Sequence, residues 1–511
     1  MVSITLYGGV GQIGGNIIAL HDPVFHANIL FDFGRSFPAE ARYYSYPQRP
    51  RTSVQLELVK TGLAPIIRGV DNRAADIYAE LKVEEKLTDY KGGVSAKMGL
   101  KRTELCYSVI EPAGECCFTD LFISHSHSDH AGLAPILRKD ITIHMGQASY
   151  ILYKTYHEAA LRAGVESRLY WEGGSDITAE GEAKPRHSYA TFHSGNTIRP
   201  QGGRLEVEPR PVDHSTAGSY GFLIHTSAGL IVYTGDFRTH GAARILTEDF
   251  LERVKAAGRP RALICEGTNL GEAKVFSEEE VRVSATRLVS QSLRQGNKLT
   301  VVEVPQADID RVRTFCEVAW EVELKPLVSK RLANYLHGLE TVRNRFLISG
   351  KPLPTLGERL GIYVERRHPQ RRDQVFAKLE ERYGELMVDA RAIKEGRDRF
   401  MIIDSNDVDL FHLKPKPKTL CILSTCEPFN EEADFEFERW KNQLCLLGVI
   451  LYHIHASGHI HPLELQRVVR EMKPQTLIPI HTEQPEMFCE LFEGEGIEVR
   501  LPQKGVPIEV A

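Results

Sequence analysis

Four side chains that can bind a metal ion lie within six residues of the sequence, in the run HSHSDH at 125–130. The run follows TDLFIS, an apolar segment with the pattern of a buried strand. In an extended segment residues i and i+2 point the same way, so His125 and His127 can hold one metal together. Asp129 and His130 lie past the bend and can face a second metal. A polar loop that is merely rich in histidine is the alternative, and this combination of residue types and spacing disfavours it.

The elements that must position these side chains are strands and turns in the first 270 or so residues. Alternating apolar segments occur as SITLY, NIIALHD and ANILFDFG near the start, and as RLEVEPRPV, GFLIHTS and GLIVYTGDF between 203 and 237. Turn residues separate them, which predicts short strands. A helix is expected from Ala148 to about Gly164. We therefore expect a β-rich region with helices packed outside it.

The pattern changes between about 270 and 440, where helix-like and strand-like segments alternate and predict a second α/β domain with a parallel sheet. A further helix is expected at 374–397. From 448 the pattern is again that of strands. We interpret the chain as one domain inserted into another, with the limits 1–271 and 453–511 for the first and 272–452 for the second. Residues 38–105 are interpreted as an insertion within the first domain, with an amphipathic helix around 74–88.

Bulk composition limits the class of protein. The chain has 511 residues, of which 42% are hydrophobic, enough for a large core in two or three domains. Its nine cysteines are scattered without a C-x-x-C pair, which favours a reducing, cytoplasmic location. No signal peptide is expected at the amino terminus, and the longest apolar run, LCLLGVILY, is far shorter than the ~20 residues of a membrane span. The net charge of −5 means that any phosphate-binding groove must be local.

The spacing H-x-H-x-D-H resembles the signature of hydrolases with the metallo-β-lactamase fold, an α/β sandwich with layers αββα. The resemblance implies two zinc ions, with Mn²⁺ or Mg²⁺ as alternatives, and further ligands at strand ends. His214 in PRPVDHSTAGS and Asp236 in LIVYTGDFR have the required types and order. Either residue alone would as readily be a satisfied turn residue. Asp32 in ANILFDFG resembles the family's strand-end aspartate, which supports the zinc site without being a strong ligand.

A second resemblance is to the β-CASP nucleases, in which a domain that grips nucleic acid is inserted into this fold. Glu266 in ALICEGTNL, His459 in HASGHIH and His481 in TLIPIHTEQ match the added motifs of that group. A histidine-rich strand edge is the alternative for His459, because other histidines flank it. Within the group the segments GGVGQIGGN, LFDFGRSFP, TGDFR, IHASGH and PIHTE resemble RNase J.

These resemblances imply a zinc-dependent phosphodiesterase that cuts nucleic acid, with single-stranded RNA as the expected substrate and internal or 5′-terminal attack both open. One zinc would be held by His125, His127 and His214, and the other by Asp129, His130 and His481, with Asp236 bridging. Asp129, Asp236, Glu266 and His459 are the expected catalytic residues, and His459, oriented by Glu266, is the candidate general acid. Alternatives are a DNA nuclease of the same fold and a catalytically silent nucleic-acid-binding homologue. A homodimer is left open.

Two weaker sites complete the sequence predictions. ILSTCEPF replaces the glycine-rich phosphate loop of RNase J, and Ser424, His455 and Ser457 are the residues left to meet a terminal phosphate. Basic stretches at 365–373 and 413–418 could grip the nucleic-acid backbone or simply be solvated surface.

Gly9, Gly11 and Gly14 form G-x-G-x-x-G, the pattern of a dinucleotide site, with Asp32 at a suitable distance. The segment after Gly14 is a short β-branched run closed by Asp-Pro. A dinucleotide site requires a helix there, so we disfavour a nucleotide cofactor.

Overall fold

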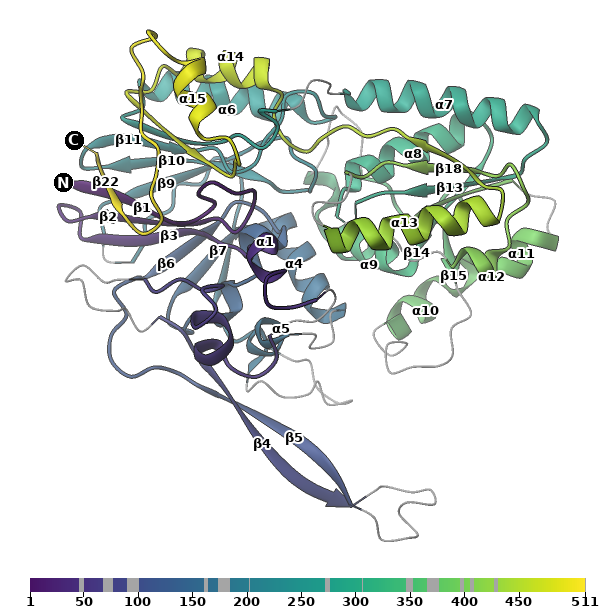
Figure 1. Ribbon diagram of the computed structural model, residues 1–511, viewed down its shortest axis with the longest axis horizontal. Helices are drawn as coiled ribbons and strands as arrows, with labels where there is room; N and C mark the ends of the chain where they lie inside the picture. The colour runs from purple at the N-terminus through teal and green to yellow at the C-terminus, as the bar shows by residue number, and fades with distance from the viewer. Residues whose placement is uncertain are drawn as a thin grey trace.

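The protein is described by a computed structural model in which three large sheets and a two-stranded ribbon account for the strands of the described residues (Figure 1). The described residues are 1–45, 50–67, 77–89, 101–159, 164–172, 184–201, 203–271, 276–305, 307–345, 353–364, 376–395, 399–404, 409–426 and 431–510. Within these ranges no helix combines the length and the apolar character needed to cross a membrane.

The first sheet has seven strands in the order β22-β1-β2-β3-β6-β7-β8. They are β22 (Pro507–Val510), β1 (Val2–Gly8), β2 (Ile17–Asp22), β3 (Ala27–Phe33), β6 (Asp120–Ile123), β7 (Thr142–Gly146) and β8 (Tyr189–Phe192). Pairing is antiparallel from β22 to β3 and parallel from β3 to β8. The two ends of the described chain therefore lie in neighbouring strands (Figure 1).

The second sheet lies against the first and has the order β21-β20-β12-β11-β10-β9. Its strands are β21 (Glu498–Val499), β20 (Thr476–Ile480), β12 (Ala262–Glu266), β11 (Gly229–Tyr233), β10 (Tyr220–Thr226) and β9 (Glu206–Pro211). Aromatic side chains fill the space between the sheets, among them Phe31 and Phe122 of the first and Phe222 and Tyr233 of the second. Burial of these rings, together with the aliphatic side chains of the same cluster, stabilises this layer.

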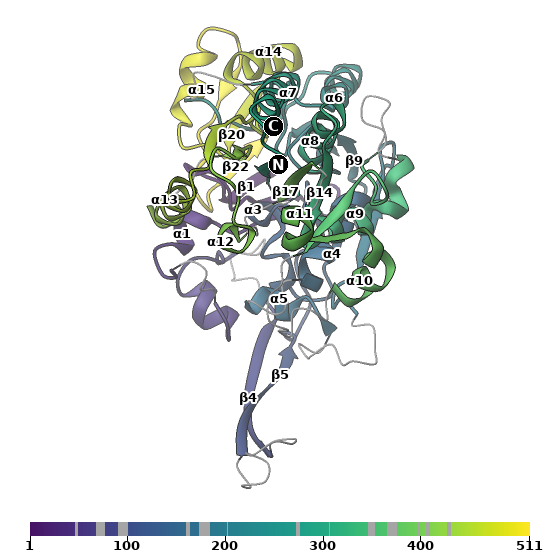
Figure 2. The same ribbon diagram turned by 90° about the vertical axis from the view of Figure 1, so that its right-hand side faces the viewer.

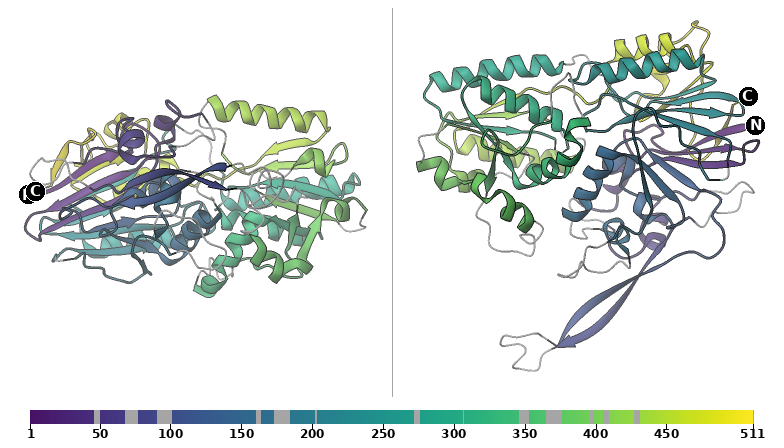
Figure 3. Two further views of the ribbon diagram at one scale, coloured as in Figure 1. Left: turned by 90° about the horizontal axis from the view of Figure 1, so that it is seen from below. Right: turned by 180° about the vertical axis from the view of Figure 1, so that it is seen from behind.

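Helices cover the outer faces of this pair of sheets (Figure 1, Figure 3). The first sheet is covered by α4 (Gln147–Ala159) and α5 (Val165–Leu169), and the second by α6 (Arg244–Ala257), α14 (Pro462–Met472) and α15 (Glu486–Leu491). The layers are thus helix, sheet, sheet, helix, which confirms the predicted αββα sandwich.

The third sheet is entirely parallel, with the order β16-β15-β14-β17-β13-β18-β19. Its strands are β13 (Leu299–Glu303), β14 (Lys325–Ser329), β15 (Gly361–Val364), β16 (Met387–Asp389), β17 (Phe400–Asp404), β18 (Leu420–Leu423) and β19 (Ile450–His453). One face packs on α7 (Glu278–Arg294), α8 (Ile309–Glu321) and α9 (Lys330–Leu339), and the other on α11 (Ala390–Glu395), α12 (Leu410–Leu413) and α13 (Glu431–Leu446). The parallel sheet of the inserted region is confirmed, whereas the residue limits of the two domains stay predictions.

The insertion between β3 and β6 carries a ribbon formed by β4 (Glu80–Asp89) and β5 (Lys101–Ile110), which projects away from the sheets in both views (Figure 1, Figure 2). Before it come α1 (Phe37–Glu40) and a π-helical turn, η1 (Val54–Val59). Residues 74–76 lie outside the described residues, and over the rest of the span the helix predicted around 74–88 is wrong, because apolar residues two apart, such as Leu81 and Val83, pair with Val109 and Tyr107 of β5.

The helix predicted at 374–397 is also wrong as one element. It is divided into α10 (Ala377–Tyr383) and α11 by β16, which pairs in parallel with β15. A partner strand distant in sequence thus overrides local helix propensity. The basic stretch 365–373 lies outside the described residues, while Lys414, Lys416 and Lys418 of the second basic stretch are exposed.

Candidate metal centre

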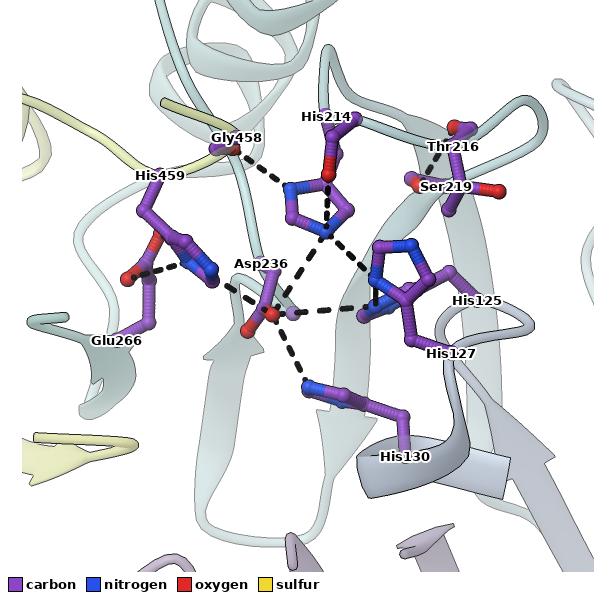
Figure 4. A network of polar contacts seen from close by, with 12 residues as sticks. His125, His127, His130, His214, Thr216, Ser219, Asp236, Glu266, Gly458 and His459 are labelled. Carbon is purple, nitrogen blue, oxygen red and sulfur yellow. Dashed lines mark hydrogen bonds and ion pairs between the residues drawn. The ribbon is translucent and has the colours of Figure 1, made fainter. Parts of the chain in front are cut away.

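The ends of strands from the first two sheets meet at one edge of the sandwich, and the predicted ligands lie there. Figure 4 shows His125, His127, His130, His214 and Asp236 at this edge. The HSHSDH run follows β6, and its second half forms the short helix α3 (Ser128–Ala131). His214 follows β9, Asp236 follows β11 and His481 follows β20. Each ligand-type residue is therefore carried by the segment directly after a buried strand, where backbone position is fixed by the sheet.

His125, His127 and His214 form one group, whose ring nitrogens lie within 4.8 Å of one another. Nδ1 of His127 is 3.1 Å from Nε2 of His125 and 3.2 Å from Nε2 of His214. The backbone carbonyl of Gly458 accepts a hydrogen bond from Nδ1 of His214 at 2.6 Å, so that Nε2 of this ring faces the group. Three imidazole nitrogens thus converge on one point.

Asp129, His130 and His481 form a second group within 4.8 Å. Nε2 of His481 lies 3.2 Å from Oδ2 of Asp129. Nδ1 of His130 lies 2.7 Å from Oδ2 of Asp32, and Nε2 of His130 consequently points into the group. The two groups are the two ligand sets that the sequence predicts.

Asp236 lies between His130 of the second group and the three histidines of the first (Figure 4). Its Oδ2 atom is 3.0 Å from Nε2 of His130 and 3.8 Å from Nε2 of both His125 and His214. It is also 3.7 Å from Nε2 of His481. One carboxylate therefore reaches ligand atoms of both groups, as a bridging ligand must.

The donor set fits a divalent metal. Oδ1 of Asp236 is buried without a hydrogen-bond partner, a state that is costly unless a further group is bound. Burial lowers the pKa of His127 to about 4 and the pKa values of His125 and His214 well below their usual range. These rings are therefore neutral near pH 7, which is the form that binds metal.

His130 shows the opposite behaviour, because carboxylates surround it. Burial lowers its pKa, but the charges of Asp236, Asp129 and Asp32 raise it well above its usual range. The negative charge of these carboxylates stabilises a positive charge at this point. A bound cation would supply that charge in place of a proton.

Asp32 supports this arrangement from behind His130. Its carboxylate accepts hydrogen bonds from the backbone N–H and hydroxyl of Ser124 at 2.7 and 2.8 Å and from the hydroxyl of Tyr233 at 2.6 Å. Asp32 is fully buried and has a left-handed backbone with φ of 51°. Such strain persists only where many contacts hold a residue in place. Asp32 is thus placed to orient the His130 ring, and it belongs to neither group of ligand atoms.

Glu266 and His459 lie beside the centre as a pair (Figure 4). Nδ1 of His459 is 3.2 Å from both carboxylate oxygens of Glu266 and 3.7 Å from Oδ2 of Asp236. Burial lowers the pKa of His459, but these two carboxylates outweigh burial and raise the pKa to about 9. His459 is thus placed to hold a proton at neutral pH.

The glycine-rich segment near the amino terminus packs on the centre. Gly14 has φ of +78°, and a Cβ atom there would lie 2.9 Å from the Asp129 side chain. The backbone N–H of His481 donates to the Gly9 carbonyl at 2.8 Å. After Gly14 the chain enters β2 instead of the helix that a dinucleotide site requires, and Gly14 serves close packing against the loop that carries Asp129.

Replacing Gly14 with alanine should therefore weaken metal binding, and Gly11→Ala provides a matched control. Both positions have positive φ, at which a side chain costs ~1–2 kcal/mol, but a Cβ at Gly11 meets nothing within 4 Å. We expect both variants to melt at a lower temperature and only Gly14→Ala to bind zinc ~10–100-fold more weakly. Equal zinc affinities in a chelator competition would contradict this account.

Buried arginines that sequence reasoning did not single out join the inserted domain to this centre. Arg311 of α8 donates to the Ala456 carbonyl at 3.0 Å, to the Ser424 carbonyl at 2.8 Å and to Glu278 of α7 at 2.8 Å. Arg238 donates to the Ser457 carbonyl at 3.1 Å and to Asp213 at 3.0 Å. The loop that carries His459 is thereby fixed to both domains.

The residues predicted to meet a terminal phosphate lie in this joint. Ser424 has no exposed surface, and its hydroxyl donates to the Ile454 carbonyl and accepts from Arg311 at 2.7 Å each. A phosphate cannot reach it, so the prediction for Ser424 is wrong. Burial, followed by the charge of Arg311, lowers the pKa of His455 to about 3. Ser457 accepts a hydrogen bond from Asn269, and the phosphate-binding roles of His455 and Ser457 stay predictions.

Comparison with known proteins agrees with this geometry. The family model of the Zn-dependent metallo-hydrolase RNA specificity domain matches residues 450–502. Ribonuclease J of Mycoplasma genitalium is 23% identical over 376 residues, which are 71% of this chain and 57% of the relative. The enzyme of that name from Helicobacter pylori is 22% identical over 487 residues, 94% of this chain and 56% of the relative. The chain thus spans about half the length of the curated relatives it matches.

A solved structure extends the comparison to the whole chain. The crystal structure of a protein of unknown function from Enterococcus faecalis has a TM-score of 0.68 at 20% identity and covers 99% of both chains. The described fold, the ligand groups and the relatives agree. The chain is similar to ribonuclease J along most of its length, and its αββα sandwich with an inserted parallel sheet agrees with a metallo-β-lactamase fold that carries a β-CASP domain.

Within this ribonuclease J-like chain the matched segment 450–502 has a defined place in the centre. It contains the loop with His459, and β20 with His481 after it. The other ligand-type residues all precede residue 237. The inserted domain lies between the two parts in sequence, and the centre forms only when both come together.

Proposed function

We propose that this chain is a phosphodiesterase that holds two zinc ions and cuts single-stranded RNA. The observation that carries the proposal is the pair of ligand groups that share Asp236, with the Glu266–His459 pair directly beside them. His125, His127 and His214 would hold one zinc, and Asp129, His130 and His481 the other. Imidazole nitrogens and carboxylate oxygens in this number are ligands that zinc prefers.

When bound, the two zinc ions supply an acidified water with a pKa near ~7 and positive charge beside the phosphate oxygens. Gly458 and Asp32 orient the rings of His214 and His130 for binding. Attack forms the new P–O bond of a 5′ phosphate and breaks the bond to the 3′ oxygen. Because Nδ1 of His459 faces Glu266, its Nε2 atom is the one that can donate a proton to the departing 3′ oxygen.

RNA is favoured over DNA by the comparisons. The RNA specificity model covers the segment that contains both His459 and His481, and the curated relatives carry the name ribonuclease J. A DNA nuclease of the same fold and a silent nucleic-acid-binding homologue are the outcomes that would replace this proposal.

The test is digestion of one end-labelled RNA carrying a 5′ monophosphate, triphosphate or hydroxyl, beside a DNA oligonucleotide of the same sequence. Zinc-loaded protein should cut the RNA and leave the DNA largely intact, and product mapping would show whether attack is internal or from the 5′ end. Cleavage of DNA at least as fast as RNA would make the protein a DNA nuclease. No cleavage of either by protein with two bound metals would make it a silent homologue.

A further inference from the structure

The hydroxyl of Thr268 lies at the meeting point of three side chains of the centre. Its Oγ1 atom is 2.7 Å from Oε2 of Glu266, 2.8 Å from Nδ1 of His481 and 3.1 Å from Nδ1 of His459. Thr268 follows β12 directly and is half-buried. Glu266, His459 and His481 lie close enough together to hold a metal, but this hydroxyl already contacts all three. The group is therefore a hydrogen-bonded cluster.

The direction of these hydrogen bonds follows from the number of protons. A hydroxyl has one proton to donate and two lone pairs that accept. A carboxylate accepts only, and a hydrogen bond to a charged group is about twice as strong as one between neutral groups. The Thr268 proton therefore goes to Glu266, at the shortest of the three distances. The hydroxyl oxygen is then left to accept from a histidine N–H.

Nδ1 of His481 is the nearer of the two histidine nitrogens, so it must carry a proton to donate to Thr268. A neutral imidazole with a proton on Nδ1 has a free lone pair on Nε2. Nε2 of His481 is the atom that faces Asp129 at 3.2 Å and Asp236 at 3.7 Å. The hydroxyl of Thr268 thus selects the form of His481 that can bind a metal.

We propose that Thr268 is a positioning residue that holds the proton of His481 on Nδ1 and presents Nε2 to the metal bound by Asp129, His130 and His481. The proposal rests on the proposed two-metal centre and deepens it. Partners of this kind to a ligating histidine typically account for 10–100-fold in metal affinity. Thr268 acts through His481 and does not touch the metal or the RNA.

The test compares Thr268→Val with Thr268→Ser in the full chain, by chelator competition for zinc with no RNA present. Valine has nearly the shape of threonine but no hydroxyl, and serine keeps the hydroxyl. We expect Thr268→Val to lower the affinity for one of the two zinc ions by ~10–100-fold and to leave the other within about 3-fold. Thr268→Ser should restore both affinities to within about 3-fold of the wild type. If the valine variant fails to fold, Thr268→Ala carries the same comparison.

A double substitution separates this role from general damage. In a His481→Asn background, where the second site is already lost, Thr268→Val should leave the affinity for the remaining zinc unchanged. Loss of that remaining affinity, a wild-type affinity in Thr268→Val, or failure of serine to rescue would each overturn the proposal. Because zinc is measured without RNA, a protein that binds two zinc ions normally but cuts no RNA would contradict the proposed function and leave this test intact.

Discussion

Replacing His459 with asparagine should slow RNA cleavage by ~10²–10⁴-fold while both zinc ions stay bound, since a general acid typically contributes this much to the rate. His459 belongs to neither of the two predicted ligand sets, and Glu266 fixes its Nδ1 atom. Asparagine can keep a hydrogen bond to Glu266 but has no group that donates a proton near neutral pH. The rate is measured under single turnover, and zinc by mass spectrometry of the same samples.

His461→Asn is the matched control, because His461 lies two residues away and caps α14 by accepting from the Leu463 N–H. Asparagine is also a good capping residue, so cleavage should be nearly unchanged. An RNA with sulfur in place of the scissile 3′ oxygen gives a leaving group that needs no proton. This substrate should be cut by His459→Asn almost as fast as by the wild type. A variant equally slow on both substrates would show that His459 has another role.

Single substitutions in the ligand sets should differ in the number of zinc ions that each variant retains. His127→Ala and His481→Asn each delete a ligand from one group, so each variant should retain about one zinc per chain. Asp236→Ala deletes the residue that lies between both groups, and it should retain fewer than one and lose cleavage by ~10³-fold or more. Asparagine is chosen at position 481 because His481 has φ of 56°, which asparagine tolerates.

Zinc content is measured after equilibration with a weak chelator. His225→Ala is the control, since His225 lies on β10 and contacts Glu208 away from the centre. It should retain two zinc ions. Two ions in Asp236→Ala, or none in both single-site variants, would contradict the bridging arrangement.

The ligand sets could be predicted from the sequence because each ligand has a recognisable pattern in the residues next to it. His125, His127, Asp129 and His130 share one run, and His214, Asp236 and His481 each follow a recognisable apolar strand. Their order along the chain then matched a known family. The parallel inserted sheet was predictable for the same reason, since each strand shows its own pattern, whereas the αββα sandwich was implied by the family resemblance.

Arg311 and Thr268 could not be predicted as supporting residues, because their roles depend on partners distant in sequence. Arg311 contacts Ala456, and Thr268 contacts His481. No spacing within the sequence relates the members of either pair. The helix prediction around 74–88 failed for a related reason. The segment that forms β4 is charged and partly apolar, and only its pairing with β5 decides that it is a strand and not a helix. Gly14 was identified in the sequence as part of a dinucleotide-binding pattern, but in the structure it packs closely against Asp129.

Arg311 connects the inserted domain mechanically to the loop that carries His459. It is fully buried, and one guanidinium connects α7, the end of β18 and the Ala456 carbonyl. His459 is three residues further along the same loop. We expect any displacement of the third sheet to move the loop that carries His459, because Arg311 joins that loop to the sheet. The position of His459 is thus tied to the position of the inserted domain.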